Sequence, residues 1–230
     1  MQKTQIADKD MMFSRRDVRK ILIPLFFETL LSVTVGIADT MMVARAGETA
    51  VSGVSCFNTI QNLLLALFAA FGTGGAVVIG QLLGMGNKKR ACFAAKQLIY
   101  LTTVISVVLG ALFIGIRNPL LHLIYGTIEE EVFLNASIYA LPILISLPFL
   151  AAMNSLNALF RSMGRTKITM QVSILANIVN IVGNAVCILV FHMGALGVGI
   201  ATLVSRVVSV IILTVRITDK ELPVHIEKFL

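Results

Sequence analysis

Charged residues are scarce in this sequence. Only 13% of its 230 residues are Asp, Glu, Lys or Arg, whereas 57% are hydrophobic, and the mean hydropathy is +0.90. Several nearly uninterrupted apolar runs reach twenty residues or more, which excludes an ordinary soluble domain and predicts a protein that crosses a membrane several times. The net charge of +7 does not indicate nucleic-acid binding, because the basic residues gather between apolar runs and form no basic face interleaved with aromatic side chains.

Motifs for metal binding, catalysis and nucleotide binding are also missing. The three cysteines, Cys56, Cys92 and Cys187, are scattered, with no CxxC pair and no histidine at ligand spacing. We therefore expect buried thiols rather than a disulfide framework or a zinc site. The pattern GxxxxGK[ST] is absent, and GTGGA and GMGNKK are too irregular for a dinucleotide fingerprint. No enzyme activity, no metal site, no cofactor and no use of ATP are expected.

The apolar runs divide the chain into six predicted membrane spans. They cover residues 21–44, 53–83, 93–116, 132–160, 168–191 and 195–216. Residues 1–20 form a cytoplasmic arm before them, and residues 217–230 form a tail after them. The first run is too long for a signal peptide and lacks a small-residue cleavage site, so we expect it to remain as a span. The expected fold is an all-α membrane protein, a bundle of six transmembrane helices.

The positions of Lys and Arg support this division and predict its orientation. Sixteen of the nineteen lie in the arm, in the second and fourth connections and in the tail. Arg45 and Arg117 lie in the other connections, and Arg206 lies within the last span. Because basic residues accumulate on the cytoplasmic side, both termini are predicted to be cytoplasmic, in a multi-pass protein of the cytoplasmic (inner) membrane.

Two carboxylates, Glu28 and Asp39, lie inside the first apolar run. They are eleven residues apart, which is about 20° around a helix and about 16 Å along it, so they share one face with Ser32. A charged carboxylate at the bilayer centre costs roughly 2.5–3.5 kcal/mol and is expected to face a wet cavity on an ion or proton pathway. Alternatively, either one is kept neutral or paired with a cation to fix packing, and this alternative is stronger for Glu28, nearer the cytoplasmic end.

Polar side chains also follow one face of the fifth span. Ser173, Asn177, Asn180 and Asn184 are spaced four, three and four residues apart, which places them in one narrow stripe of a helix. We interpret this stripe as the polar wall of a central cavity opposite Asp39. Hydrogen bonding between packed helices is the alternative.

The second span carries two further patterns. Three polar residues near its outer end share one face: Asn58, Gln61 and Asn62. Helix packing or a solvated rim is the favoured interpretation of this face. Small residues then recur every four positions: Gly72, Ala76, Gly80 and Gly84. Such a ladder predicts close approach of another helix.

Four stretches, in order along the chain, carry a family resemblance. They are ADTMMVARAGETAVSGVS after the first span, GTGGAVVIGQLLGMGNKKRA closing the second, LPFLAAMNSLNALFRSMGRTK closing the fourth, and NIVNIVGNAVCILVFHMGALGVGIATLVSR across the fifth and sixth. Over residues from about 14 to 216 the chain resembles the multidrug and toxic compound extrusion (MATE) transporters. The resemblance implies a secondary antiporter that exports organic cations, drugs or metabolites in exchange for Na⁺ or H⁺.

The resemblance also implies roles for single residues. Asp39 matches a central cation-coupling aspartate in the first helix of the family. Pro24 matches a proline at which that helix is proposed to bend, as expected where a backbone hydrogen bond is removed. At Asn184 some relatives carry an aspartate. Because an amide does not titrate, this chain has either one coupling carboxylate in its site or Glu28 in place of the second.

The remaining implied site residues lie on three spans. Tyr139, Asn177, Asn180 and Thr202 match positions that contribute to a polar site in the N-terminal half of related transporters. Asn180, Asn184 and Glu28 are assigned to cation coupling with Asp39. Tyr139, Asn177 and Thr202 are assigned to the substrate cavity.

Length is the main departure from the family. MATE transporters have about twelve helices in two six-helix lobes related by a twofold axis along the membrane normal. This sequence of 230 residues covers one lobe, and its ending RITDKELPVHIEKFL resembles the start of the connection between lobes. A fragment, a truncated product and a half-transporter that pairs all remain open. The expected partners are the lipid bilayer, a small amphipathic or cationic substrate, and a second lobe or second copy.

Two alternative functions remain. One is a lipid-linked oligosaccharide flippase of the same superfamily, which is expected to carry more cationic residues in its cavity than the single intramembrane Arg206. The other is an inactive, truncated membrane remnant.

Overall fold

The computed structural model describes residues 15–126, 129–219 and 221–226, and all regular structure in these ranges is helical. The helices are α1 (Arg15–Ala44), α2 (Glu48–Gly84), α3 (Lys88–Tyr125), α4 (Glu130–Ile145), α5 (Leu147–Ser162), α6 (Thr166–Ala185) and α7 (Gly194–Ile217). A π-helical segment, η1 (Val186–Val190), continues α6. Residues 1–14 of the predicted arm and residues 220 and 227–230 of the tail lie outside the described ranges.

The helices are consistent with the predicted spans. Five helices are each long and apolar enough to cross a membrane, and the bent pair of α4 and α5 passes the same test when it is taken as one broken span. Helices suit this environment because they satisfy every interior backbone hydrogen bond within one segment. Several helices run beyond the apolar stretches, and α3, for example, continues to Tyr125, past the predicted end at residue 116. Hydropathy marks the part inside lipid, whereas a helix extends into its polar flanks.

The fourth span is not the continuous helix that its hydropathy predicts. It breaks at Ser146, and α4 and α5 are bent by 51°. Pro142 lies inside α4 and Pro148 lies in the first turn of α5, so two backbone N–H donors are missing around the break. The Ser146 hydroxyl at the break donates to the Ile143 carbonyl at 2.7 Å.

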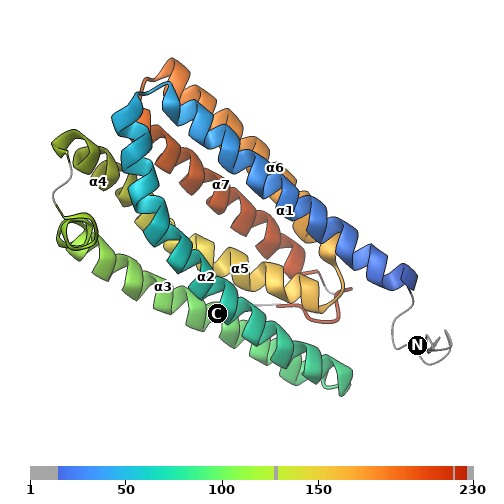
Figure 1. Cartoon of the computed structure of the whole chain (residues 1–230). Helices are drawn as coiled ribbons and strands as arrows, with labels where there is room; N and C mark the ends of the chain where they lie inside the picture. Colours follow the sequence, from blue (N-terminus) through green and yellow to red (C-terminus); the bar gives the residue numbers. More distant parts are fainter. Residues whose placement is uncertain (1–14, 127–128, 220, 227–230) are drawn as a thin grey trace, which may run out of the picture.

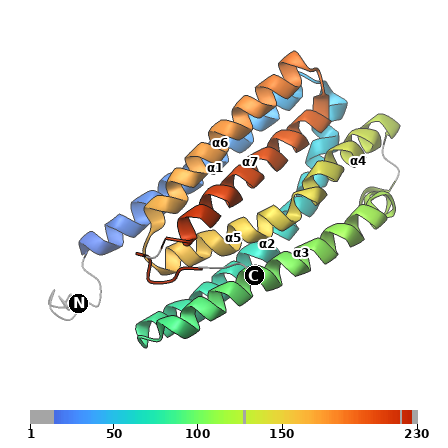
Figure 2. The ribbon, with the colours of Figure 1, turned by 180° about the vertical axis from the view of Figure 1, so that it is seen from behind.

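The spans are arranged around α7. In both views, α1 and α6 run side by side along one flank, α3 lies at the opposite flank beside α2 and α5, and α7 lies between the two groups (Figures 1 and 2). One apolar cluster includes Phe57 and Leu147, and a second, towards the C-terminal end of α7, includes Phe160 and Leu213. The polar faces of α1 and α6 meet on the side that faces α7.

Close helix contacts follow only part of the predicted glycine ladder. An added Cβ at Gly72 would lie 3.1 Å from the Asn154 carbonyl oxygen of α5, but at Gly80 and Gly84 nothing lies within 4 Å. The prediction is therefore wrong for the latter two, which lie beyond the reach of a neighbouring helix. A closer approach to backbone is at Gly53, where an added Cβ would lie 2.7 Å from the Ala136 backbone nitrogen.

Candidate functional site

A polar cavity of about 450 Å³ lies among the helices, with walls from α1, α2, α4, α5, α6 and α7. Six of the predicted site residues line it: Glu28, Asp39, Tyr139, Asn177, Asn180 and Thr202. Asn184, also predicted, lies behind Asp39 and is fully buried. The 3.6-residue helical period accounts for this convergence, because it places the polar residues of α1 and α6 on single faces.

The Asp39 carboxylate is held by amides. The Asn184 amide nitrogen donates to Asp39 Oδ1 at 2.6 Å. With its amide nitrogen turned towards the carboxylate, Asn180 donates to the two Asp39 oxygens at 3.0 and 3.2 Å. When the Asn180 amide is rotated by 180°, its nitrogen donates to Thr202 Oγ1 of α7 at 3.3 Å. Asn180 therefore lies between Asp39 of α1 and Thr202 of α7. We call Asp39, Asn180, Asn184 and Thr202 the Asp39 cluster.

No cation among the described residues neutralises Asp39. Within the described ranges, no Lys, Arg or His side chain lies at ion-pair distance from its carboxylate. Amide donors stabilise a carboxylate through hydrogen bonds but do not cancel its charge. The Asp39 cluster therefore retains one negative charge whenever Asp39 is ionised.

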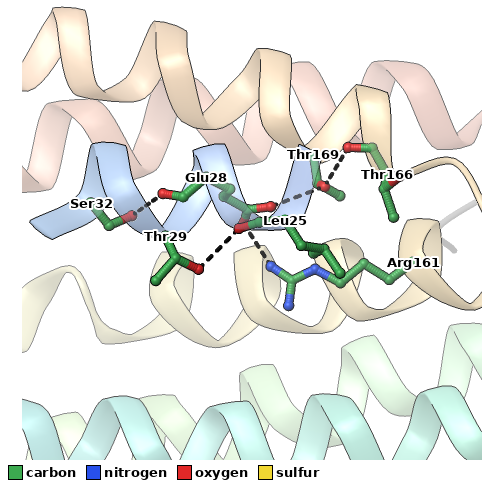
Figure 3. Close-up of polar contacts among 7 residues, drawn as sticks. All are labelled: Leu25, Glu28, Thr29, Ser32, Arg161, Thr166 and Thr169. Carbon is green, nitrogen blue, oxygen red and sulfur yellow. Dashed lines mark hydrogen bonds and ion pairs between the residues drawn. The ribbon is translucent and has the colours of Figure 1, made fainter. Parts of the chain in front are cut away.

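Glu28 is in a different situation. Its Oε1 accepts from Arg161 Nη2 of α5 at 2.6 Å, and its Oε2 accepts from the Thr169 hydroxyl of α6 at 3.3 Å (Figure 3). The Ser32 hydroxyl, one turn along α1, donates to the Glu28 backbone carbonyl rather than to the carboxylate. Glu28 and Asp39 thus line one cavity without sharing partners, and the charge of Glu28 is compensated inside the protein.

Tyr139 connects α4 to α2 across the cavity. It is 3% exposed, and its hydroxyl donates to Asn58 Oδ1 at 3.0 Å or Gln61 Oε1 at 3.3 Å. The sequence favoured packing or a solvated rim for Asn58, Gln61 and Asn62. Asn58 and Gln61 do contact Tyr139 of the packed helix α4, and all three residues also line the cavity.

Sequence reasoning assigned no site role to several polar residues of the cavity, among them two asparagines and an arginine. Asn154 and Asn157 line it from α5, and Arg206 lines it from α7. The Asn157 Oδ1 and the predicted Asn177 Nδ2 are both buried without a hydrogen-bond partner among the described residues. A spacing of three residues within LPFLAAMNSLNALF was the available signal for the α5 pair, but the bent span obscured which face points inward.

Pro24 is buried inside α1, one turn before Glu28. It supplies no N–H to the carbonyl one turn earlier, which weakens the helix at this point. The helix nevertheless runs from Arg15 to Ala44 as one element. The bend expected from the family resemblance remains a prediction.

Comparisons with known proteins agree with this architecture. The family pattern described as MatE matches residues 24–186. The chain is 32% identical over 202 residues to the "Uncharacterized transporter YisQ" of Bacillus subtilis, covering 86% of this chain and 44% of that protein. It is 29% identical over 211 residues to the "Probable multidrug resistance protein NorM" of Thermotoga maritima, covering 90% of this chain and 45% of that protein.

Solved structures show the same fold. One titled "Outward-facing conformation of a multidrug resistance MATE family transporter of the MOP superfamily" superposes with a TM-score of 0.86 at 21% identity, over 94% of this chain and 48% of that one. Another, titled "Crystal structure of MATE in the straight conformation", superposes with a TM-score of 0.86 at 23% identity, over 92% of this chain and 47% of that one.

The chain spans about half the length of the relatives it matches. Members of the matched family are transporters rather than enzymes. The match covers most of the chain, and the helices have the arrangement of one transporter lobe. The chain is a multi-pass membrane protein and belongs to the MATE family of multidrug efflux transporters.

Proposed function

We propose that the chain forms one lobe of a secondary antiporter that exports amphipathic organic cations, drugs or metabolites in exchange for Na⁺ or H⁺. The family supports transport, and two similar proteins are named a probable multidrug resistance protein and a multidrug export protein. The exchange with a cation is supported by the Asp39 cluster.

The observation that carries the proposal is the contrast between the two carboxylates of α1. Glu28 has Arg161 as an internal cation at 2.6 Å, whereas Asp39 has amide donors and no cation among the described residues. An uncompensated carboxylate in a membrane span is unfavourable. Asp39 is therefore the carboxylate that is stabilised most when a cation or proton enters the cavity. The Glu28 carboxylate serves instead to hold α1 to α5 through Arg161.

The amides of the Asp39 cluster suit this exchange. An amide offers N–H donors to an empty carboxylate and, after rotation, an oxygen to a metal cation. The Asn184 Oδ1 is buried without a partner in the described part of the chain, so an oxygen is available beside the carboxylate. A proton would instead neutralise Asp39 directly. Either cation would remove the charge that now relies on amide donors alone.

The remainder of the cavity suits an amphipathic substrate. Tyr139, Asn177 and Thr202 supply polar groups, and Leu150 and Met153 supply apolar surface in the same wall. Binding sites of this type combine mostly apolar walls with a few placed polar groups. We assign the substrate to these lining residues and the coupling cation to Asp39, Asn180 and Asn184, with Pro24 as the point at which α1 bends between states.

The membrane orientation belongs to the same proposal. Both termini lie in the cytoplasm and the protein in the cytoplasmic membrane, as the distribution of Lys and Arg indicates. A second lobe or a second copy of the chain supplies the other half of the cavity. With an even number of spans, two copies would insert in the same orientation, as a parallel twofold assembly requires.

The comparisons do not favour the flippase alternative, since the similar proteins with a described role are named for multidrug resistance or export. If the chain were an inactive remnant, it would show neither export nor cation dependence, and the experiment described next tests this alternative as well.

The experiment is ethidium extrusion by cells that lack other drug exporters and express the chain. We expect extrusion driven by an imposed Na⁺ or proton gradient, its loss in Asp39→Asn, and its retention in the matched control Asp219→Asn, which removes an exposed tail carboxylate. Membrane levels of the variants are compared by immunoblot. Normal extrusion by Asp39→Asn, or wild-type extrusion that neither gradient drives, would overturn the proposal.

A further inference from the structure

Arg206 is a charged residue in the middle of the membrane. It lies in α7, twelve residues after Gly194 and eleven before Ile217, or about 17 Å from either end of that helix. It is 7% exposed. A guanidinium at this depth is unfavourable and marks a functional position unless another group compensates its charge.

The protein supplies little compensation. Arg206 Nη1 donates to the Ser146 hydroxyl at the α4–α5 break, but a hydroxyl carries no charge, and a guanidinium has five N–H donors. No Asp or Glu of the described ranges lies at ion-pair distance from Arg206. The ion pair found in these ranges joins Glu28 to Arg161. Buried charges are normally paired, so Arg206 has an unmet requirement for an anion.

Arg206 is also one of the residues that line the polar cavity, together with Leu150 and Met153 of α5. Thr202 of the Asp39 cluster lies one turn earlier on the same face of α7, about 6 Å along the helix axis. The cavity therefore contains an uncompensated positive group one helical turn from Thr202, the α7 member of the Asp39 cluster, and apolar side chains in the same lining.

We propose that Arg206 binds the carboxylate of an amphipathic compound carried in this cavity. A planar guanidinium matches a carboxylate with two parallel hydrogen bonds, and the apolar wall receives the body of the compound. The inference deepens the proposed function, on which it rests for the use of the cavity, by extending the substrates to compounds with a carboxylate. Asp39 and Arg206 then serve different ions: Asp39 the coupling cation and Arg206 the anionic group of the substrate.

A purely structural role makes a different prediction. If Arg206 only fastens α7 to the α4–α5 break through Ser146, ligand charge has no effect on binding, and added carboxylates do not shield the guanidinium.

The first test compares two probes of the same shape on the purified full chain in nanodiscs. We expect saturable binding of radiolabelled benzoate above empty nanodiscs, and at least tenfold weaker binding of the neutral benzamide. Arg206→Gln is expected to weaken benzoate binding at least tenfold without changing benzamide binding, and Arg206→Lys to restore part of the difference. Equal binding of the two probes by the wild type, or no effect of Arg206→Gln on benzoate, would overturn the inference.

A second test needs no variant and applies even if Arg206→Gln does not fold. Phenylglyoxal modifies accessible arginines, and mass spectrometry reports each site. Benzoate is expected to slow modification of Arg206 severalfold and to leave the exposed Arg216, in the last turn of α7, unchanged. Equal rates with and without benzoate, or an Arg206 that never reacts, would refute a carboxylate site open to the cavity. Na⁺ and proton binding measured on the same samples report on Asp39, so the two proposals fail separately.

Discussion

Neutralising Arg161 is expected to destabilise the protein more than neutralising Glu28. The two groups form one ion pair at 2.6 Å, but the Arg161 side chain is 43% exposed and the Glu28 side chain only 13%. Arg161→Gln leaves a mostly buried carboxylate without its cation. Glu28→Gln leaves a long side chain that can turn its guanidinium towards water.

The magnitudes follow from this difference. Two charges about 4 Å apart attract by about 4 kcal/mol at an effective dielectric constant of about 20, and desolvation of Glu28 with ordering of Arg161 offsets much of it. The pair lies between exposed pairs, which contribute about 0.2–1 kcal/mol, and buried pairs, whose disruption costs about 3–5 kcal/mol. We expect the free energy of unfolding to fall by about 1 kcal/mol in Glu28→Gln, about 2–3 kcal/mol in Arg161→Gln and about 1 kcal/mol in the double variant.

A double-mutant cycle on the purified chain measures these values, with unfolding in mixed micelles followed by far-ultraviolet circular dichroism. Arg161 also lies in the last turn of α5, where its charge favours the helix dipole, but this contribution cancels in the cycle. Arg165→Gln is the matched control, since Arg165 is exposed and its side chain caps no helix. Additive effects of Glu28→Gln and Arg161→Gln, or a smaller loss in Arg161→Gln than in Glu28→Gln, would refute the reasoning.

Three further predictions concern packing and the cavity. Gly53→Ala should lower the free energy of unfolding by about 2–3 kcal/mol, because the new Cβ meets backbone atoms of α4. The control Gly74→Ala adds its Cβ in open space on the same helix and should raise the free energy of unfolding by about 0.5–1 kcal/mol. Equal effects of the two variants in thermal unfolding would contradict this. Tyr139→Phe loses the hydroxyl contacts to α2 and should cost about 1–2 kcal/mol in the same assay, whereas an unchanged stability would show those contacts to be dispensable. Asn184→Asp places a second carboxylate beside Asp39, so the variant should retain one proton between the two carboxylates at neutral pH; proton uptake equal to that of the wild type would argue against it.

Much of the site could be predicted from the sequence because helical periodicity is local. The polar stripe of α6 and the position of Asp39 follow from spacing alone, and the structure brings Asn180 and Asn184 to that carboxylate. Apolar runs likewise predict the spans, since lipid leaves few alternatives to helices.

The rest depends on contacts between distant segments. Arg161 is 133 residues from Glu28, and no local pattern pairs them. The break at Ser146 lies inside a continuous apolar run, so hydropathy alone could not reveal it or the inward face of α5. Arg206 stood out in the sequence as a charge in a span, but only the packing of α7 against the α4–α5 break shows that it lines the cavity, with no carboxylate partner in the described part of the chain.

The most direct test of the central claim is cation binding by the purified chain. Binding of ²²Na⁺ and uptake of protons would be titrated in nanodiscs for the wild type, Asp39→Asn and Glu28→Gln. The account predicts that Asp39→Asn removes the one cation that the wild type takes up, as Na⁺ or as a proton, and that Glu28→Gln keeps it, since Arg161 already compensates Glu28. Cation uptake that survives in Asp39→Asn, or that is lost in a folded Glu28→Gln, would contradict it.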